Sequence, residues 1–383
     1  MLMRIMMSSE NYPHNKMTLI NLKINNMNMG IYNLEEVYSH KSLSKKTGYP
    51  SVVFSFDETN TLRETSIISN SDLFVDGYWK SIIKPTQANE VFNNKDLYNN
   101  FKKGSLLLEK FRSKKLTTSQ VFDLDKLASW LAIGDVFGGW HGFSWGNIKF
   151  SYDPKTNKIY PLIWDMIDED NVATSEVNNP LNLRLFRLND PYMDPTSVYW
   201  KDIFSDPKLI SVYIKKLNQL CKDGYVNNIL SSKMVLIKNY MFHLNKDYPQ
   251  ISYENEIKKV YDNINFLRTN YLEPAVPAFA SLINDNNKPQ LIFLNRKPIP
   301  IEIIGIRNKI TNQFIPISNS KIIVPRAPFK QQMKKYTIDL NISNENWIDF
   351  NKTSDYIIEA RLIGTDNINQ IEINWYAHNF DRN

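Results

Sequence analysis

The residues whose types could carry chemistry gather in one segment, 135–170, which reads DVFGGWHGFSWGNIKFSYDPKTNKIYPLIWDMIDED. His141 and Asn147 share a polar loop, and a hairpin turning at 153–158 would return the chain so that Asp165 lies beside Asn147. Phosphoryl transfer of the kinase type uses this layout: a loop residue orients the acceptor hydroxyl, while an Asn and an Asp hold a divalent metal on the phosphates. Amide and carboxylate oxygens suit Mg²⁺ or Mn²⁺. The segment therefore predicts Asn147 and Asp165 as metal ligands.

The same residues also have a purely structural interpretation. Asn147 would begin a strand, Asp165 would cap the turn that follows, and the nearby Trp145 and Trp164 would be core aromatics. Residue spacing by itself does not decide between the two interpretations. The common Gly-rich nucleotide-binding, metalloprotease and hydrolase signatures are absent from the sequence, so no second motif competes with this segment.

A buried helix and a β-hairpin must position this segment. Asp123 is a helix cap, and the residues after it, as far as 137, place apolar side chains on nearly every side, which is typical of a central helix. Asp153 and Pro154, followed by Asn157, are typical of a tight turn between two strands. The predicted order is buried helix, polar loop, hairpin and aspartate.

The flanking elements are predicted from hydrophobic periodicity. Before the segment we expect a β-hairpin at 18–38, a short basic helix at 42–46, a strand at 51–56 and a helix from Asp96 to about 111. After it we expect three helices, at 205–224, 227–245 and 252–273.

The last quarter of the chain has a different composition. After the linker-like NDNNKP at 284–289, short β-rich runs alternate with turn residues, a spacing that predicts a small all-β sandwich. We therefore expect an α+β protein with two domains, 1–286 and 287–383.

Composition narrows the class of protein. The 383 residues are 42% hydrophobic and 22% charged, which indicates a folded chain of more than one domain. The net charge of +6 is spread along the chain, so no nucleic-acid partner is expected. A single cysteine, Cys221, excludes an internal disulfide and a Cys-based zinc site.

No apolar run reaches the ~18 residues that span a bilayer, so we expect no transmembrane helix. The start is unlike a signal peptide, so we expect a cytoplasmic chain, or one outside the cytoplasm or in the cell envelope if an upstream segment precedes it.

Several blocks agree in order and spacing with one family. NMGIYNLEE at 28–36, the helix at 123–137 and WGNIKFSYDPKTNKIYPLIWD at 145–165 resemble the CotH (spore coat protein H) kinase family, an atypical protein-kinase-like fold. The resemblance covers roughly residues 18–275 and implies a bilobal kinase-like domain with a truncated N-lobe, followed by the β-sandwich. It also implies that Asp165 binds the metal with Asn147, and that Glu35 or Glu36 steadies a phosphate-binding lysine.

Some positions depart from the family pattern. The strand after the Glu-Glu pair carries Ser55 where a lysine is expected, so Lys80 or Lys84 would have to contact the phosphates. His141 stands near the position where active members carry an aspartate base, and a neutral imidazole accepts a proton near pH 7. Asp135 is the other candidate for that role. The family's upstream strands, with an Arg-Gly-Asn-Ser type of segment, are expected only if the chain extends further upstream.

Two functions follow from the resemblance. The first is a protein kinase that uses ATP with Mg²⁺ or Mn²⁺ and transfers the γ-phosphate to Ser or Thr of a partner protein. The second is a catalytically degraded CotH-like scaffold or binding protein that takes part in coat or cell-envelope assembly. In either case we expect the C-terminal sandwich to contact a glycan or a protein.

Overall fold

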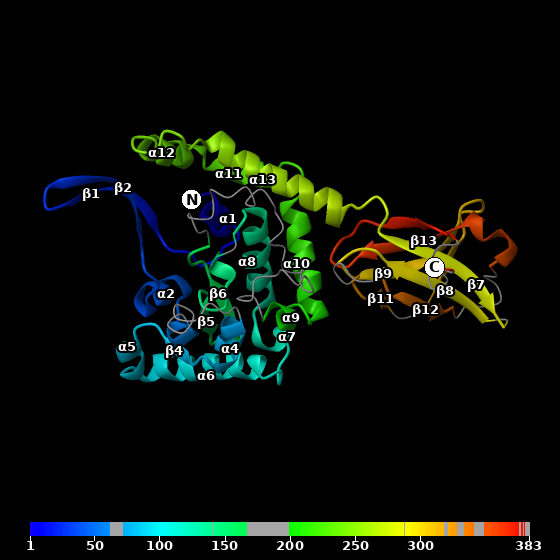
Figure 1. Cartoon of the computed structure of the whole chain (residues 1–383), viewed down its shortest axis with the longest axis horizontal. Coiled ribbons are helices and arrows are strands. Elements are labelled where there is room, and N and C mark those ends of the chain that lie inside the picture. The colour runs from blue at the N-terminus through cyan, green and yellow to red at the C-terminus, as the bar shows by residue number, and fades with distance from the viewer. Residues whose placement is uncertain are drawn as a thin grey trace. The chain divides into compact units, whose positions relative to one another are not determined.

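The computed structural model describes residues 1–61, 72–139, 141–166, 199–286, 288–317, 321–327, 333–340, 348–374, 377 and 379. The fold is mixed α+β, with several antiparallel sheets. It divides into two compact units (Figure 1). The first takes in the described part of Met1–Arg184 and Tyr192–Asn265, and the second the described part of Phe266–Asn383.

A four-stranded antiparallel sheet organises the first unit. Its strands, in spatial order, are β4 (Ile83–Pro85), β3 (Val53–Phe56), β5 (Lys149–Asp153) and β6 (Lys158–Leu162). β5 and β6 form the predicted hairpin, and the turn between them uses Asn157 at φ 55°, a left-handed conformation that Asn tolerates. Because β3 pairs with β5, the sheet joins the strand before the helical stretch 95–136 to the hairpin after it.

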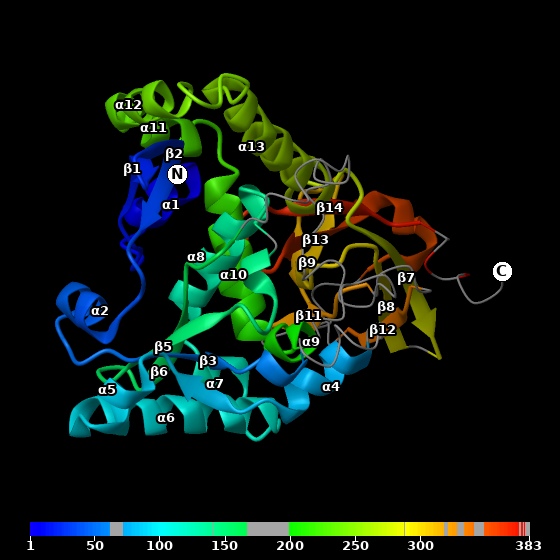
Figure 2. The ribbon, with the colours of Figure 1, turned by 60° about the vertical axis from the view of Figure 1, so that its left-hand side comes forward.

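One face of this sheet lies against α6 (Lys95–Arg112), which Figures 1 and 2 show running along it. Alternation along the strands places Phe54 and Phe150 on that face. Gly104 is where the helix approaches most closely, because a Cβ there would lie 2.7 Å from Phe54 Cζ. The opposite face of the sheet is partly covered by Tyr38 and Leu43, which cluster with apolar side chains of β3 and β6.

The predicted central helix is α8 (Leu124–Val136), and every residue from 127 to 136 is buried. Asp123 caps it as predicted, since its carboxylate accepts a hydrogen bond from the Lys126 amide at 3.1 Å. α10 (Pro207–Leu220) runs beside α8 in both views (Figures 1 and 2) and begins at a proline that Asp206 precedes as the cap. This helix pair forms the apolar interior next to the hairpin.

Further elements surround this interior. They are α1 (Leu2–Ser9), β1 (Met17–Ile24), β2 (Met27–Glu35), α2 (His40–Thr47), α4 (Asp72–Lys80), α5 (Ala88–Phe92), α7 (Thr118–Val121), the 3₁₀-helix η1 (His141–Phe143), α9 (Trp200–Ile203), α11 (Tyr225–Ser232), α12 (Met234–Leu244) and α13 (Tyr253–Leu267). β1 and β2 form a separate two-stranded sheet, which confirms the predicted hairpin.

The second unit begins with the π-helix η5 (Arg268–Leu272) and contains two antiparallel sheets. The three-stranded sheet has the order β12 (Lys335–Asp339), β8 (Lys288–Asn295), β7 (Ala278–Asp285). The other has the order β10 (Phe314–Pro316), β9 (Ile301–Asn308), β13 (Tyr356–Leu362), β14 (Asn369–Glu372), with β11 (Ile322–Val324) also paired to β9; the 3₁₀-helix η7 (Phe350–Asp355) precedes β13. The β-rich character expected of the tail is therefore observed.

The structure differs from the predicted elements in several places. The single helix predicted at 227–245 is two helices, α11 and α12, because Lys233 between them leaves helical geometry with φ −113° and ψ 14°. Residue 286, the expected domain boundary, lies in the turn between β7 and β8, and β7 belongs to the second unit. Asn-rich sequence suits a tight turn as well as a linker, which explains this difference. Local patterns also did not predict α4, α5 and β4, nor α1, whose buried side consists of Met3, Ile5, Met6 and Met7.

Candidate functional site

The β5–β6 hairpin and η1 bring three of the predicted site residues together. Asn147 Nδ2 lies 3.0 Å from His141 Nδ1 and 3.2 Å from His141 Nε2. Asp165 Oδ2 lies 3.1 Å from His141 Nδ1. The side chains of His141 and Asp165 are 33% and 44% exposed, so solvent reaches the group. We call these three residues the His–Asn–Asp cluster.

Backbone geometry holds this cluster together. Gly142 lies so close to the segment after β6 that a Cβ there would overlap the Trp164 carbonyl oxygen and lie 2.7 Å from Met166 Sδ. Asp165 has φ 46°, in the left-handed region that L residues seldom adopt, at a cost of about 1–2 kcal/mol. Strain of this kind persists where the surroundings impose it, and it is concentrated at functional sites.

Two lysines lie on the sheet beside the cluster. Ser55 of β3 pairs with Lys84 of β4. On its other side, β3 runs antiparallel to β5 with Phe54 opposite Phe150, and continuing that register by one residue places Lys149 opposite Ser55. Directly opposed residues point to the same face of a sheet, so the two lysines flank Ser55 on the face away from α6. We call this the lysine row. Lys84 was a predicted phosphate contact, whereas Lys149 was not, because the pairing of β3 with β5 is a tertiary feature.

Among the carboxylates, Glu58 has the largest electrostatic effect on Lys149, ahead of Asp165. It packs on Gly146, where a Cβ would overlap its carboxylate. Burial raises the pKa of Glu58, against the opposing charges of Lys149, His141 and Lys84. Burial likewise lowers the pKa of Lys149, against the charge of Glu58. The other carboxylate at the row, Asp57, pairs with Lys84 at 2.6 Å.

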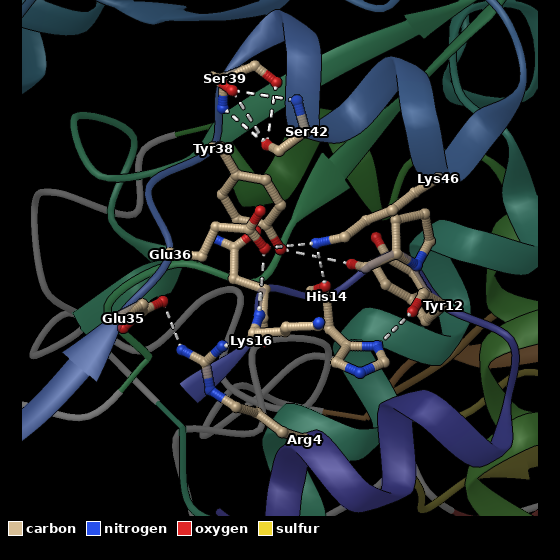
Figure 3. A network of polar contacts seen from close by, with 12 residues as sticks. Arg4, Tyr12, His14, Lys16, Glu35, Glu36, Tyr38, Ser39, Ser42 and Lys46 are labelled. Carbon is tan, nitrogen blue, oxygen red and sulfur yellow. Dashed lines mark hydrogen bonds and ion pairs between the residues drawn. The ribbon is translucent and has the colours of Figure 1, made fainter. Parts of the chain in front are cut away.

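Glu35 and Glu36, expected beside a phosphate-binding lysine, lie in a different network (Figure 3). Glu35 Oε1 forms an ion pair with an Arg4 guanidinium nitrogen at 2.5 Å. Glu36 Oε2 pairs with Lys46 Nζ at 3.0 Å, and the hydrogen bond from Lys46 lowers the Glu36 pKa. These contacts join the end of β2 to α1 and α2. In the structure Lys84 is paired with Asp57 instead.

The two remaining predicted residues, Lys80 and Asp135, have partners outside the cluster. Lys80 of α4 pairs with Asp76 one helical turn earlier at 2.8 Å, and its side chain is 77% exposed. Asp135 is only 4% exposed, and its Oδ2 accepts a hydrogen bond from the Tyr213 hydroxyl of α10 at 2.7 Å. A carboxylate buried between α8 and α10 is withdrawn from an acceptor hydroxyl, so this placement favours the structural interpretation of Asp135.

Two side chains of the cluster carry oxygen donors. The Asn147 amide oxygen and the Asp165 carboxylate are hard donors of the kind that Mg²⁺ and Mn²⁺ prefer. Within the described ranges, no three His, Cys, Asp or Glu side chains group as metal ligands. The acidic residues at 168–170 lie outside those ranges.

Comparison of the chain with protein-family models and with curated proteins finds no match in either case. No helix in the described part of the chain is long and apolar enough to cross a membrane. The fold and site define a mixed α+β protein with an open His–Asn–Asp cluster beside a lysine row.

Proposed function

We propose that the chain is a CotH-like, protein-kinase-like phosphotransferase that transfers the γ-phosphate of ATP to a Ser or Thr hydroxyl of a partner protein. The observation that supports this proposal is the convergence of His141, Asn147 and Asp165 from the two ends of one hairpin. In this interpretation α8 and α10 belong to the helical lobe, and the β5–β6 hairpin is the active-site hairpin.

Each residue of the cluster has a role in this proposal. Asn147 and Asp165 would hold Mg²⁺ or Mn²⁺, which would neutralise the charge of the β- and γ-phosphates. His141 accepts the proton of the acceptor hydroxyl, and its contact with Asp165 steadies the imidazolium that forms. The hydroxyl oxygen then bonds to the γ-phosphorus as the bond to the β-phosphate oxygen breaks, which releases ADP.

Asp165→Asn tests the proposal without changing the shape of the side chain, and Asn tolerates the left-handed φ at this position. The full chain should gain thermal stability with ATP plus Mg²⁺ or Mn²⁺. At ~100 times Kd the gain is about 2.7 kcal/mol. Asp165→Asn should lose this metal-dependent gain and the phosphorylation of added protein. Asp76→Asn, at an exposed aspartate of α4, is the matched control and should behave as wild type.

A wild-type chain that shows neither a metal-dependent shift nor ATP turnover would contradict the kinase proposal. If Asp165→Asn keeps the full metal-dependent gain in thermal stability with ATP, Asp165 does not bind the metal.

The second candidate is a catalytically degraded CotH-like scaffold in coat or cell-envelope assembly. One observation favours it: Glu35 and Glu36 are engaged by Arg4 and Lys46 rather than by a lysine of the row. This candidate predicts a folded chain without ATP turnover. Turnover that depends on the metal and on Asp165 would overturn it.

For the second unit we propose a β-sandwich that contacts a glycan or a protein. Its two antiparallel sheets with buried apolar strands support this proposal. A glycan array probed with the full chain tests the glycan part, and absence of binding would leave a protein partner as the proposal.

A further inference from the structure

The lysine row places two ammonium groups on the face of the sheet away from α6, on either side of the buried Ser55. Neighbouring strands are about 4.8 Å apart, so the backbones of Lys84 and Lys149 are about 10 Å apart, with Ser55 between them. Lys84 is exposed, and Lys149 is half-buried. Two like charges at this separation repel each other unless an anion lies close to both.

Glu58 supplies a negative charge near Lys149, although the two side chains form no ion pair among the described contacts. Among the described contacts Lys84 is bonded to Asp57, whereas no ion pair joins Lys149 to Glu58. Lys149 Nζ instead lies 5.6 Å from the ring centre of Trp164, the residue before Asp165. Lys149 therefore lies near the chain next to Asp165 of the His–Asn–Asp cluster.

Glu58 also lies against the backbone next to Asn147. Its carboxylate packs on Gly146, and a side chain at that position would displace it. A group that drew Lys149 away from Glu58 would therefore act directly beside one of the proposed metal ligands. Phosphate suits this place, because it offers several acceptor oxygens to two ammonium groups at once.

We propose that Lys149 and Lys84 form a subsite for a di- or triphosphate group. The phosphate displaces two resident counter-charges, Glu58 at Lys149 and Asp57 at Lys84. This inference rests on the proposed function, since it assigns the nucleotide phosphates to the lysine row. The family resemblance places a lysine at the position of Ser55. In this chain the lysine row would supply the positive charge instead, from the strands on either side of Ser55. Glu58 weakens phosphate binding because it competes for Lys149, as Asp57 does for Lys84.

The experiment measures binding of tripolyphosphate without metal, and of ATP with Mg²⁺, to the full chain by calorimetry. A charge-assisted hydrogen bond of this kind corresponds to about 10- to 100-fold in affinity. Lys149→Met should therefore weaken tripolyphosphate binding at least ~10-fold, and Lys149→Arg should retain most of it. Glu58→Gln, which keeps the shape and removes the charge, should tighten binding about 10-fold. Lys102→Met, at an exposed lysine of α6, is the matched control and should leave binding unchanged.

The outcomes separate this inference from the proposed function. If ATP binds with metal but Lys149→Met and Glu58→Gln bind both ligands as wild type does, the subsite is overturned and the kinase proposal stands. If ATP with metal does not bind while tripolyphosphate binds and responds to both variants, the subsite stands and the kinase proposal fails. If Glu58→Gln binds no tripolyphosphate, the subsite is overturned. Circular dichroism confirms that each variant is folded.

Discussion

Gly142→Ala should separate His141 from Asp165 in a chain that still folds. The added Cβ would overlap the Trp164 carbonyl oxygen and lie 2.7 Å from Met166 Sδ, where ordinary contact begins at 3.4 Å. A shift of about 0.7 Å would relieve the sulfur contact and would lengthen the 3.1 Å His141–Asp165 contact to about 3.8 Å, beyond hydrogen-bond range. Overpacking of this kind costs about 1–3 kcal/mol, and the lost surface pair adds at most about 1 kcal/mol. We expect a loss of about 2–3 kcal/mol.

Urea unfolding followed by tryptophan fluorescence measures this loss, because Trp130 and Trp200 are buried in the first unit. With a slope of about 3 kcal/mol/M the midpoint should fall by roughly 1 M, and the metal-dependent ATP shift should disappear. Gly139→Ala is the control, since its Cβ would meet only side chains, including the flexible ends of Met3 and Met166, at 3.2–3.3 Å. Equal midpoints for both variants, with ATP binding intact, would refute the argument that the backbone approach at Gly142 holds the cluster.

Three other substitutions test how the surrounding elements are held, each by its urea midpoint. Gly104→Ala in α6 should cost about 1–2 kcal/mol, because overpacking against β3 exceeds the gain of about 1 kcal/mol in helix propensity. Arg112→Ala should cost about 3 kcal/mol, since the buried guanidinium donates to the Ser81 carbonyl at 2.7 Å and to the Ser81 hydroxyl at 3.1 Å. Burial raises the Asp206 pKa, but hydrogen bonds, first of all those from Ser119, outweigh it and leave the pKa lowered. The charged Asp206 carboxylate therefore stabilises the fold at pH values above the unfolded pKa of about 3.9. This stabilisation is lost as pH falls through the lower folded pKa, and the urea midpoint declines with it. Asp206→Asn should make this decline in acid shallower.

Each of these predictions has a control on an exposed residue. Asn99→Ala in α6 should stabilise slightly, by up to about 0.7 kcal/mol, so a loss there equal to that of Gly104→Ala would argue against close packing as the cause. Lys110→Ala, two residues before Arg112, should change the free energy of unfolding by less than about 0.5 kcal/mol. Asn99→Ala, which removes no titrating group, should keep the wild-type acid decline, and an identical response in Asp206→Asn would contradict the pH argument.

Local patterns predicted most elements of the first unit. The cap at Asp123, the apolar stripes after it and the Asp153–Asn157 turn indicated α8 and the β5–β6 hairpin, and the structure contains both. The break at Lys233 was not predicted, since the apolar pattern of α11 continues into α12. The turn between β7 and β8 at residue 286 was not predicted either, because a linker and a hairpin turn have similar amino-acid compositions.

The candidate site was predicted only in part, and for a physical reason. A hairpin returns its two ends to the same place, so the sequence by itself determined that Asp165 would lie near the loop of Asn147. Which strand lies beside that hairpin depends on long-range packing, which no local pattern encodes. Only the tertiary structure decided that β3 and β4 pair beside β5, which brings Lys84 and Lys149 to the two sides of Ser55. It also decided that the carboxylate next to Lys149 is Glu58, while Glu35 is held by Arg4.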